Sequence, residues 1–443
     1  MPLISQKSDI PITGQIIPAP DKSISHRSII FASLANGLSK IYNLLEGEDV
    51  LKTINAMRLM GVEIQKYDDH YQINGSGIVG LMEPNNFLDM GNSGTSSRLL
   101  AGLVCPYNFT TFFSGDDSLR KRPMSRVFEP IKLFGAQIHA RQNNLMPFAV
   151  IGNSETMPIE YSMKMASAQV KSCILLASLA TRGTTTIIEP EKCRDHTEIM
   201  MRSLGLKILQ QNLSIPNLAS GSFGTKISYS GMQEFAGKEF FIPNDISSSA
   251  FFMVASVLIK NSKVILKDVG VNPLRTGLVD TLLEMGANIS FHNIREIGGE
   301  KVADIEVQYS KLKGVDVPAS RSASMIDEYP ILAIACAFAN GTSKLNGLAE
   351  LKAKESNRLL MIAQNLEKCG VEVKMTNDSL EIKGGFSMPK NRIKISTAMD
   401  HRIAMSFLIM GLLLENGVEI DDDSMIQTSF PNFESIFEQF NIK

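Results

Sequence analysis

Six segments of the chain repeat one order of polar and apolar positions. Each begins with a polar stretch, continues as an apolar helix of about three turns, and passes through a Gly or Asn turn into a β-rich strand. The polar stretches lie near residues 25–27, 96–98, 167–169, 247–249, 324–327 and 400–402. Self-similarity of this kind indicates one supersecondary unit used six times.

In each of the first five units, a second amphipathic helix ends at an apolar residue or Cys that is followed by glycine. These glycines recur every 70 to 84 residues and are Gly61, Gly135, Gly205, Gly286 and Gly370. Glycine supplies the left-handed conformation that ends a helix. Six units of about 74 residues fill the 443-residue chain, and the sixth would end with it, at Phe440-Asn441-Ile442.

Short return strands predict how the units combine. One follows each of the first five units, as in residues 70–75, and the sixth unit has none. The N-terminal residues 9–14 show the same pattern, so we expect them to close the sixth unit. The fold would then be α/β (α+β) with two similar domains, residues 21–242 and residues 1–20 plus 243–443. The crossings near 20–21 and 243–244 would act as hinges, and ligands commonly bind between such domains.

Composition narrows the function classes. A net charge of −2 argues against a nucleic-acid partner, and 44% apolar residues allow large cores. No apolar stretch reaches the roughly 18 residues of a membrane-spanning helix, and no signal peptide is visible, so we expect no membrane partner. The five cysteines include no CxxC pair. Buried thiols in a reducing cytoplasm are therefore expected, rather than disulfides or a metal site.

Cations stand where helices should begin. Lys22, His26 and Arg27 lie at one predicted helix start, and His401 and Arg402 at another. N-capping explains the neighbouring serines, but cations are unfavourable at the positive end of a helix dipole unless an anion binds there. Helix N-termini that face one cleft would form an anion-binding site. The pattern favours substrates that carry phosphate or carboxylate groups.

Four further segments fit such a site, and each also has an ordinary explanation. Gly94 lies in a short loop before a helix, which is also typical of a plain turn, and Arg122 ends a basic run that a solvated loop explains equally well. Lys354 and Arg358 are spaced i,i+4 at a predicted helix start, as in a surface ion-pair ladder. Asp327 could cap a helix, or accept a proton from a hydroxyl group.

Eight motifs together resemble the 5-enolpyruvylshikimate-3-phosphate synthase family. They follow the family's order and span nearly the whole chain: 21–27 (DKSISHR), 91–95 (GNSGT), 122–124 (RPM), 167–172 (SAQVKS), 194–198 (RDHTE), 327–330 (DEYP), 354–358 (KESNR) and 400–402 (DHR). The resemblance implies two domains of three βαβαββ units each, an inside-out α/β barrel, with the active site in the cleft between the domains.

The resemblance also implies the reaction. The 5-hydroxyl of shikimate 3-phosphate attacks C2 of phosphoenolpyruvate while C3 is protonated, and a tetrahedral ketal forms. Loss of a C3 proton and of phosphate gives the enolpyruvyl ether, in the shikimate pathway to chorismate and the aromatic amino acids. The family needs no metal and no organic cofactor, and its members are targets of glyphosate. Both substrates are small anions, and we expect the chain to act as a monomer.

The resemblance assigns roles to thirteen residues. Lys22, Asp327 and Glu355 would be catalytic: Asp327 would accept the 5-hydroxyl proton, and Glu355 would donate a proton to C3 and later remove one. Shikimate 3-phosphate would bind Lys22, Ser23, Arg27, Ser167, Gln169, Arg194, Asp327 and Lys354. Phosphoenolpyruvate would bind Lys22, Gly94, Arg122, Gln169, Arg358 and Arg402.

The chain departs from the family pattern at two positions. Thr428 stands where many members carry a Lys that contacts phosphoenolpyruvate, and Asn357 replaces a common Asp. Gly94 leaves the space that glyphosate requires, so we expect the enzyme to be inhibitable.

Three alternatives remain at this point. The related enolpyruvyl transferase that acts on UDP-N-acetylglucosamine has a Cys in the loop corresponding to residues 114–124, and this loop has none. A non-catalytic repeat scaffold that encircles DNA is the second, and the net charge of −2 argues against it. The presence of both Asp327 and Glu355 argues against the third, a degenerate member that binds phosphosugars without turnover.

Overall fold

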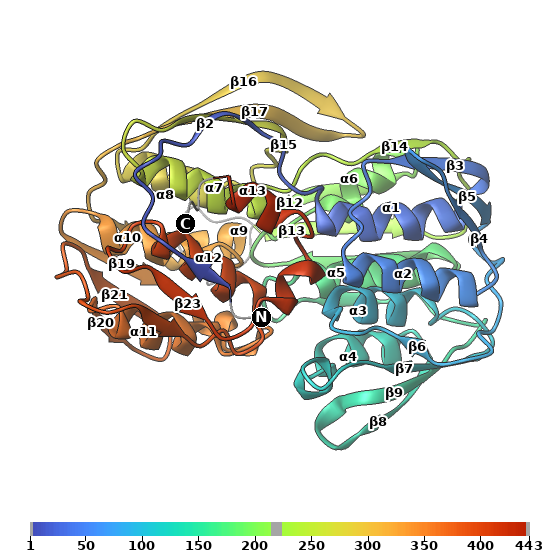
Figure 1. Cartoon of the computed structure of the whole chain (residues 1–443). Coiled ribbons are helices and arrows are strands. Elements are labelled where there is room, and N and C mark those ends of the chain that lie inside the picture. Colours follow the sequence, from blue (N-terminus) through green and yellow to red (C-terminus); the bar gives the residue numbers. More distant parts are fainter. Residues whose placement is uncertain (1–2, 214–223, 440–443) are drawn as a thin grey trace. The chain divides into compact units, whose positions relative to one another are not determined.

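The computed structural model describes residues 3–213 and 224–439 (Figure 1). The chain forms two compact units. Unit 1 comprises Met1–Asp21, Pro243–Glu296 and Lys301–Lys443, and unit 2 comprises Lys22–Ile242 and Ile297–Glu300. Each unit contains three repeats. Among the described residues, five of the six have the strand and helix order strand, helix, strand, helix, strand, strand, with one additional short helix in unit 1, and the third repeat of unit 1 has three strands.

Unit 2 begins at its first helix and takes the missing first strand from its own C-terminal end. The first repeat contains β14 (Glu239–Phe241), α1 (Lys22–Leu34), β3 (Asn36–Tyr42), α2 (Glu48–Leu59), β4 (Glu63–Lys66) and β5 (His70–Ser76). The second contains β6 (Leu88–Asp89), α3 (Gly94–Leu103), β7 (Thr110–Ser114), α4 (Ser125–Leu133), β8 (Gln137–Arg141) and β9 (Leu145–Ile151). The third contains β10 (Glu160–Ser162), α5 (Ala168–Leu179), β11 (Thr184–Glu189), α6 (His196–Ser203), β12 (Ile208–Leu213) and β13 (Gly224–Ser230).

The first two repeats of unit 1 follow the same strand order, and strands near the N-terminus complete its first and third repeats. Its first repeat contains β2 (Thr13–Ile16), α7 (Ile246–Leu258), β15 (Lys263–Gly270), α8 (Gly277–Glu284), β16 (Asn288–Ile297) and β17 (Glu300–Gln308). The second contains β18 (Asp316–Val317), α9 (Ser322–Met325), α10 (Tyr329–Phe338), β19 (Thr342–Asn346), α11 (Arg358–Lys368), β20 (Glu372–Met375) and β21 (Ser379–Lys383). The third contains β22 (Ile393–Ile395), α12 (His401–Gly411), β23 (Val418–Ile420), α13 (Phe433–Phe437) and β1 (Ile4–Ser5).

One sheet topology recurs in the five four-stranded repeats, and the remaining sheet has the order β1-β23-β22. The first strand pairs parallel with the second, as β6 does with β7, and the last two strands add in antiparallel orientation, as in the order β6-β7-β9-β8. The first helices α1, α5, α7 and α10 are buried along nearly their whole length and form the core, with α3 packed on α5 and α10 packed on α12. Helices α7 and α10 are apolar on nearly all sides, which is typical of a fully buried helix. The six-repeat α/β prediction is confirmed.

The predicted glycine turns are confirmed. All five glycines that follow the second helices have positive φ, from +82° at Gly205 to +104° at Gly135. Side chains other than glycine are strained in this region, which explains the residue choice. The predicted end of the sixth unit, Phe440-Asn441-Ile442, lies outside the described residues.

The predicted closure of the sixth unit was wrong in its residues. The strand within 9–16 is β2, which pairs parallel with β15 and belongs to the fourth repeat. The sixth sheet is closed instead by β1, antiparallel to β23, where Ser5 lies against Gly411 and Gly417 and donates to the carbonyl of Leu408 at 2.7 Å. Residues 9–14 and β1 both have the sequence pattern of an edge strand. The alternation of polar and apolar residues therefore could not predict which of them closes the sixth sheet. The close approach to two glycines selects the short Ser5 side chain.

The five cysteines are free and buried, as predicted. Burial raises the pKa of the Cys336 thiol to about 12, which keeps it protonated and unreactive at neutral pH. Among the described helices, none is long and apolar enough to cross a membrane.

Candidate active site

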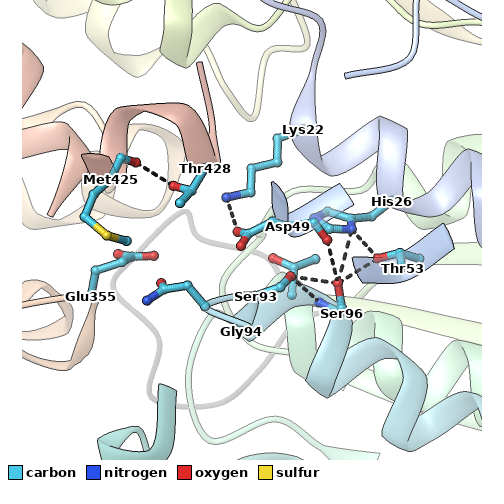
Figure 2. A network of polar contacts seen from close by, with 12 residues as sticks. Lys22, His26, Asp49, Thr53, Ser93, Gly94, Ser96, Glu355, Met425 and Thr428 are labelled. Atoms are coloured by element: carbon cyan, nitrogen blue, oxygen red, sulfur yellow. Dashed lines mark hydrogen bonds and ion pairs between the residues drawn. The ribbon is translucent and has the colours of Figure 1, made fainter. Parts of the chain in front are cut away.

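The first group of predicted site residues lies in unit 2, at the start of α1. Lys22 is the first residue of this helix, and its ammonium group forms an ion pair with Asp49 in the first turn of α2 (Figure 2). Asp49 is nearly buried, and it stands where a carboxylate favours the helix N-terminus. The carboxylate therefore fixes the Lys22 side chain.

A chain of hydroxyl groups connects α1 to the loop that carries Gly94 (Figure 2). Thr53 Oγ1 lies 2.7 Å from both His26 Nδ1 and Ser96 Oγ. Ser96 Oγ lies 2.7 Å from Ser93 Oγ, which also accepts from the Ser96 amide and caps α3. The first turn of α3, which begins at Gly94, is thus held to the neighbouring helices by a buried polar chain.

His26 does not supply the positive charge expected of it. Its side chain is completely buried, and burial lowers its pKa well below the ordinary value, with the charges of Lys22 and Arg27 adding to the effect. The ring is therefore neutral at neutral pH. Its role at this helix start is packing and hydrogen bonding.

Arg122 is tied to the Gly94 loop. It donates from Nη2 to Asn92 Oδ1 at 2.6 Å and to Ser118 Oγ at 3.1 Å. A β-carbon on Gly94 would lie 3.3 Å from Nη1 of Arg122 and 2.8 Å from Nη1 of Arg98. The absence of a side chain at this position lets two guanidinium groups approach the loop.

Arg98 joins the Gly94 loop to Gln169. Its Nη1 donates to the Gly94 carbonyl at 3.2 Å and to Gln169 Oε1 at 2.8 Å, while Gln169 Nε2 donates to Thr95 Oγ1 at 3.1 Å. Ser167 caps α5 by accepting from the Val170 amide. Sequence reasoning placed Gln169 in the site but missed Arg98, although its i,i+4 spacing from Gly94 was visible.

Arg27 is buried among hydroxyl groups. It donates to Thr197 Oγ1 and Ser172 Oγ, each at 2.7 Å, and to the Ser23 carbonyl at 2.8 Å. These contacts connect the starts of α1, α5 and α6. The guanidinium group is thereby held in one orientation, as recognition of a phosphate requires.

Arg194 lies in the segment between β11 and α6, and the residue before it is fixed by buried charges. The Cys193 amide donates to Glu189 at 2.9 Å, and Lys171 pairs with Glu189 at 2.9 Å and with Glu198 at 2.8 Å. Burial alone would lower the pKa of Lys171, but Glu198, Cys193 and Glu189 raise it. Lys171 therefore stays charged beneath this segment.

The second group lies in unit 1 and gathers around Asp327. Arg358 Nη1 donates to Asp327 Oδ1 at 3.1 Å, and Lys354 Nζ lies 3.6 Å from the same oxygen. Arg402 Nη1 donates to the Asp327 carbonyl at 3.3 Å. Three predicted site cations thus surround one predicted catalytic carboxylate, whose side chain remains 15% exposed.

Arg358 binds three carboxylates. Besides Asp327 it pairs with Glu355 and, at 2.8 Å, with Asp400, and its side chain is 1% exposed. Burial alone would lower the pKa of Arg358, but the charges of Asp400, Glu355 and Asp327 outweigh burial and raise it. Asp400 also caps α12 by accepting from the Arg402 amide at 3.0 Å. Asp400 therefore fixes both arginines.

The predicted helical i,i+4 pair of Lys354 and Arg358 was wrong. Helix α11 begins at Arg358, because Asn357 caps it by accepting from the Leu360 amide at 3.2 Å, and Lys354 has extended backbone. Both cations nevertheless meet at Asp327. Asn357, which stands where an Asp is common in the resembling family, is an ordinary N-cap residue.

Thr428, which stands at the family's Lys position, donates to the Met425 carbonyl at 2.7 Å (Figure 2). The side chain is buried, and its hydroxyl is engaged with its own short helix, Ser424–Thr428. No cation replaces the Lys at this position of the chain.

The structure thus brings the predicted residues together in two groups, one in each unit. Sequence reasoning missed three residues that orient them, Asp49, Arg98 and Asp400. Asp49 and Asp400 each lie at a helix start, where a carboxylate is ordinary, so the sequence carried no distinct signal. Among residues 3–213 and 224–439, no group of three His, Cys, Asp or Glu side chains is placed to hold a metal ion.

Comparison with known proteins gives one consistent result. A family model described as EPSP synthase (3-phosphoshikimate 1-carboxyvinyltransferase) matches residues 7–437. The 3-phosphoshikimate 1-carboxyvinyltransferase of Paramagnetospirillum magneticum is 48% identical over 441 residues, 99% of this chain and 97% of the relative. The enzyme of that name from Gluconobacter oxydans is 46% identical over 432 residues, 98% and 96% of the two chains.

Solved structures agree with the sequence relatives. An EPSP synthase from Acinetobacter baumannii has a TM-score of 0.84 at 39% identity and covers 100% of this chain and 98% of its own. The enolpyruvyl transferase NikO from Streptomyces tendae has a TM-score of 0.75 at 15% identity over 99% and 97% of the two chains, which shows a shared fold. Because the family match spans nearly the whole chain and relatives near half identity cover it, this chain belongs to the EPSP synthase family.

Proposed function

We propose that this chain transfers the enolpyruvyl group of phosphoenolpyruvate to the 5-hydroxyl of shikimate 3-phosphate and releases phosphate. The observation that carries the proposal is the cluster in unit 1. It combines two partly exposed carboxylates, Asp327 and Glu355, with the buried cation Arg358. Proton transfer to and from carbon and oxygen beside anionic substrates requires this combination of groups.

Asp327 is the proposed base. Its Oδ1 accepts from Arg358 and faces Lys354, and these two cations hold the carboxylate that would take the 5-hydroxyl proton. Glu355 is the proposed acid toward C3. Its Oε2 accepts from Arg358, which holds the carboxyl group that would deliver the proton. The same carboxylate then removes a C3 proton when phosphate leaves.

The residues of unit 2 are proposed to bind and orient the anions. Shikimate 3-phosphate would use Lys22, Ser23, Arg27, Ser167, Gln169 and Arg194, with Asp327 and Lys354 from unit 1. Phosphoenolpyruvate would use Lys22, Gly94, Arg122 and Gln169, with Arg358 and Arg402 from unit 1. The hydrogen bonds that fix Arg27 and Arg122 support these roles, because fork-shaped guanidinium groups recognise phosphate and carboxylate bidentately.

We also propose that the crossings near 20–21 and 243–244 act as hinges between domains of residues 21–242 and of residues 1–20 plus 243–443. The chain would act as a monomer in the cytoplasm. Five buried free thiols support a reducing compartment.

The test is phosphate release when the purified chain is mixed with both substrates. We expect release only when shikimate 3-phosphate and phosphoenolpyruvate are both present. Omission of either substrate, and UDP-N-acetylglucosamine in place of shikimate 3-phosphate, are the controls. Release with the nucleotide sugar but not with shikimate 3-phosphate would overturn the proposal, as would binding of both anions without turnover.

Gly94→Ala is expected to weaken the binding of both phosphoenolpyruvate and glyphosate. The loss of affinity should be larger for glyphosate. The added methyl group would displace the guanidinium groups of Arg98 and Arg122. One methyl group in a fitted pocket is worth about 10- to 200-fold in discrimination. We expect a rise of about tenfold in the KM for phosphoenolpyruvate, with the KM for shikimate 3-phosphate nearly unchanged.

The matched control for this variant is Gly270→Ala, where a β-carbon has only ordinary contacts at 3.6 Å or more. Inhibition is measured as the glyphosate concentration that halves turnover at fixed phosphoenolpyruvate. Full activity of the unchanged chain at millimolar glyphosate would contradict the role given to Gly94.

A further inference from the structure

A buried arginine outside the proposed site connects two distant parts of the sequence. Arg275 precedes α8 and is 2% exposed. Its Nη1 lies 3.5 Å from Asp21 Oδ2, and its Nη2 lies 3.2 Å from Asp245 Oδ1. Both aspartates lie close in sequence to the points where the chain passes from one unit to the other, since unit 2 begins at Lys22 and ends its main segment at Ile242.

The two crossing segments are paired where Arg275 contacts them. The Asp21 amide donates to the Pro243 carbonyl at 2.8 Å, and the Asp245 amide donates to the Ala19 carbonyl at 2.8 Å. Asp21 immediately precedes Lys22. Arg275 therefore neutralises the carboxylates on both strands of this short pairing.

The same guanidinium group reaches the segment that carries Asp327. Its Nη2 donates to Ser247 Oγ at 2.7 Å, and Ser247 Oγ donates in turn to Glu328 Oε1. Glu328 is 1% exposed and immediately follows Asp327. One contact chain, Arg275 to Ser247 to Glu328, thus ends at the residue beside the proposed base.

We propose that Arg275 and Glu328 are positioning residues for the reaction: through Ser247 they fix the backbone at Asp327 relative to the crossing segment that leads into Lys22. The inference rests on the proposed function, because it gives Asp327 the role of base. A buried ion pair is by itself weak evidence for a stabilising role, since apolar residues of similar volume often stabilise as well. A positioning role explains why the buried residue is charged, and why its contacts lead through Ser247 to Glu328 beside Asp327.

The electrostatic interactions of Arg275 also connect it to Glu328 and Asp327. Burial alone would lower the pKa of Arg275, but Asp245, Asp21, Glu328 and Asp327 raise it, in that order of effect. The Asp327 carboxylate is also faced by Lys354 and Arg358. Beyond these, Glu355 and Asp400 share Arg358, and Arg402 binds the Asp327 carbonyl. Arg275 is therefore one of several cations that act on Asp327.

The test compares Arg275→Gln, Glu328→Gln and the double variant. Each single change is expected to lower kcat about 10- to 100-fold with both KM values within about threefold. Because both residues act through one chain of contacts, the double variant should be no slower than the slower single variant. Arg295→Gln, which removes an exposed pair with Asp268 in the same unit, is the matched control and should leave kcat unchanged.

A second readout does not depend on turnover. The Asp327 carboxyl is titrated by ¹³C NMR in Asp-labelled protein and assigned with Asp327→Asn. Loss of the Arg275 cation should raise the midpoint of the Asp327 titration, and loss of the Glu328 anion should lower it. The acid limb of the kcat–pH profile should move in the same two directions, because the base must be ionised to act.

A merely structural pair would give lower melting temperatures, multiplicative losses of kcat and no opposed shifts, and that result would overturn the inference. If Arg275→Gln does not fold, Glu328→Gln keeps the side-chain shape and carries the test alone. Absence of turnover in the unchanged chain would refute the proposed function, while the titration of Asp327 would still decide the role of Arg275.

Discussion

Replacement of Glu355 by Gln is expected to lower turnover about a thousandfold while shikimate 3-phosphate binds nearly as before. General acid–base catalysis by a positioned group contributes about 100- to 10,000-fold, and Glu355 is proposed to act twice, as acid and then as base at C3. Gln keeps the side-chain shape but can neither donate nor remove this proton. The neighbouring Arg358 would retain Asp327 and Asp400 as partners, so the cluster should remain folded.

Three measurements check this expectation. Phosphate release gives kcat, calorimetry gives the affinity for shikimate 3-phosphate, and deuterium entry at C3 of phosphoenolpyruvate in heavy water reports protonation directly. Glu367→Gln, an exposed position on α11, the helix that follows Glu355 in the chain, is the control and should change none of them. Turnover that persists in Glu355→Gln, with deuterium still entering C3, would show that another group is the acid.

Local patterns of the sequence were enough to predict the repeats. A helix that ends at Gly61 or Gly135 needs a left-handed residue there, and this need is set by the backbone of a few neighbouring residues. The strand that closes the sixth unit could not be predicted from local patterns. Residues 9–14 and β1 both fit an edge strand, and the choice depended on packing of Ser5 against Gly411 and Gly417, more than 400 residues away. Such long-range fit leaves no local signal.

In the candidate site, too, the sequence predicts some residues and not others. Cations at helix starts, such as Lys22 and Arg402, could be predicted to bind anions. Their partners could not, because Asp49 and Asp400 look like ordinary capping residues until their distances to the cations are known. The neutral state of His26 likewise follows from complete burial, which the sequence does not reveal.

Arg358 shows how one residue serves both stability and chemistry. It was expected either in a surface ion-pair ladder or as a ligand for phosphoenolpyruvate, and in the structure it is buried and pairs with three carboxylates. Bidentate recognition of a substrate carboxylate requires a guanidinium group held in one orientation. The three carboxylates hold Arg358 in that orientation. They also concentrate negative charge, which the positive charge of Arg358 compensates.

Arg358→Met is therefore expected to lower the free energy of unfolding by about 3–5 kcal/mol, the usual range when one partner of a buried ion pair is removed. Asp400, which is completely buried, would lose its cation. The deficit relative to the unchanged chain should be largest near neutral pH and should shrink as the pH falls, because protonation removes the unbalanced negative charge. Urea unfolding at several pH values measures this, with phosphoenolpyruvate present and absent.

Two companion variants make the expectation specific. Arg321→Met removes an arginine that pairs with the exposed Glu284 at 2.6 Å, and it should cost only about 0–1 kcal/mol. Arg358→Met combined with Asp400→Asn should be more stable than Arg358→Met alone, because the added change removes the buried charge that was left without its cation. Equal losses of stability in the Arg358 and Arg321 variants, independent of pH, would contradict the view that Arg358 balances buried carboxylates.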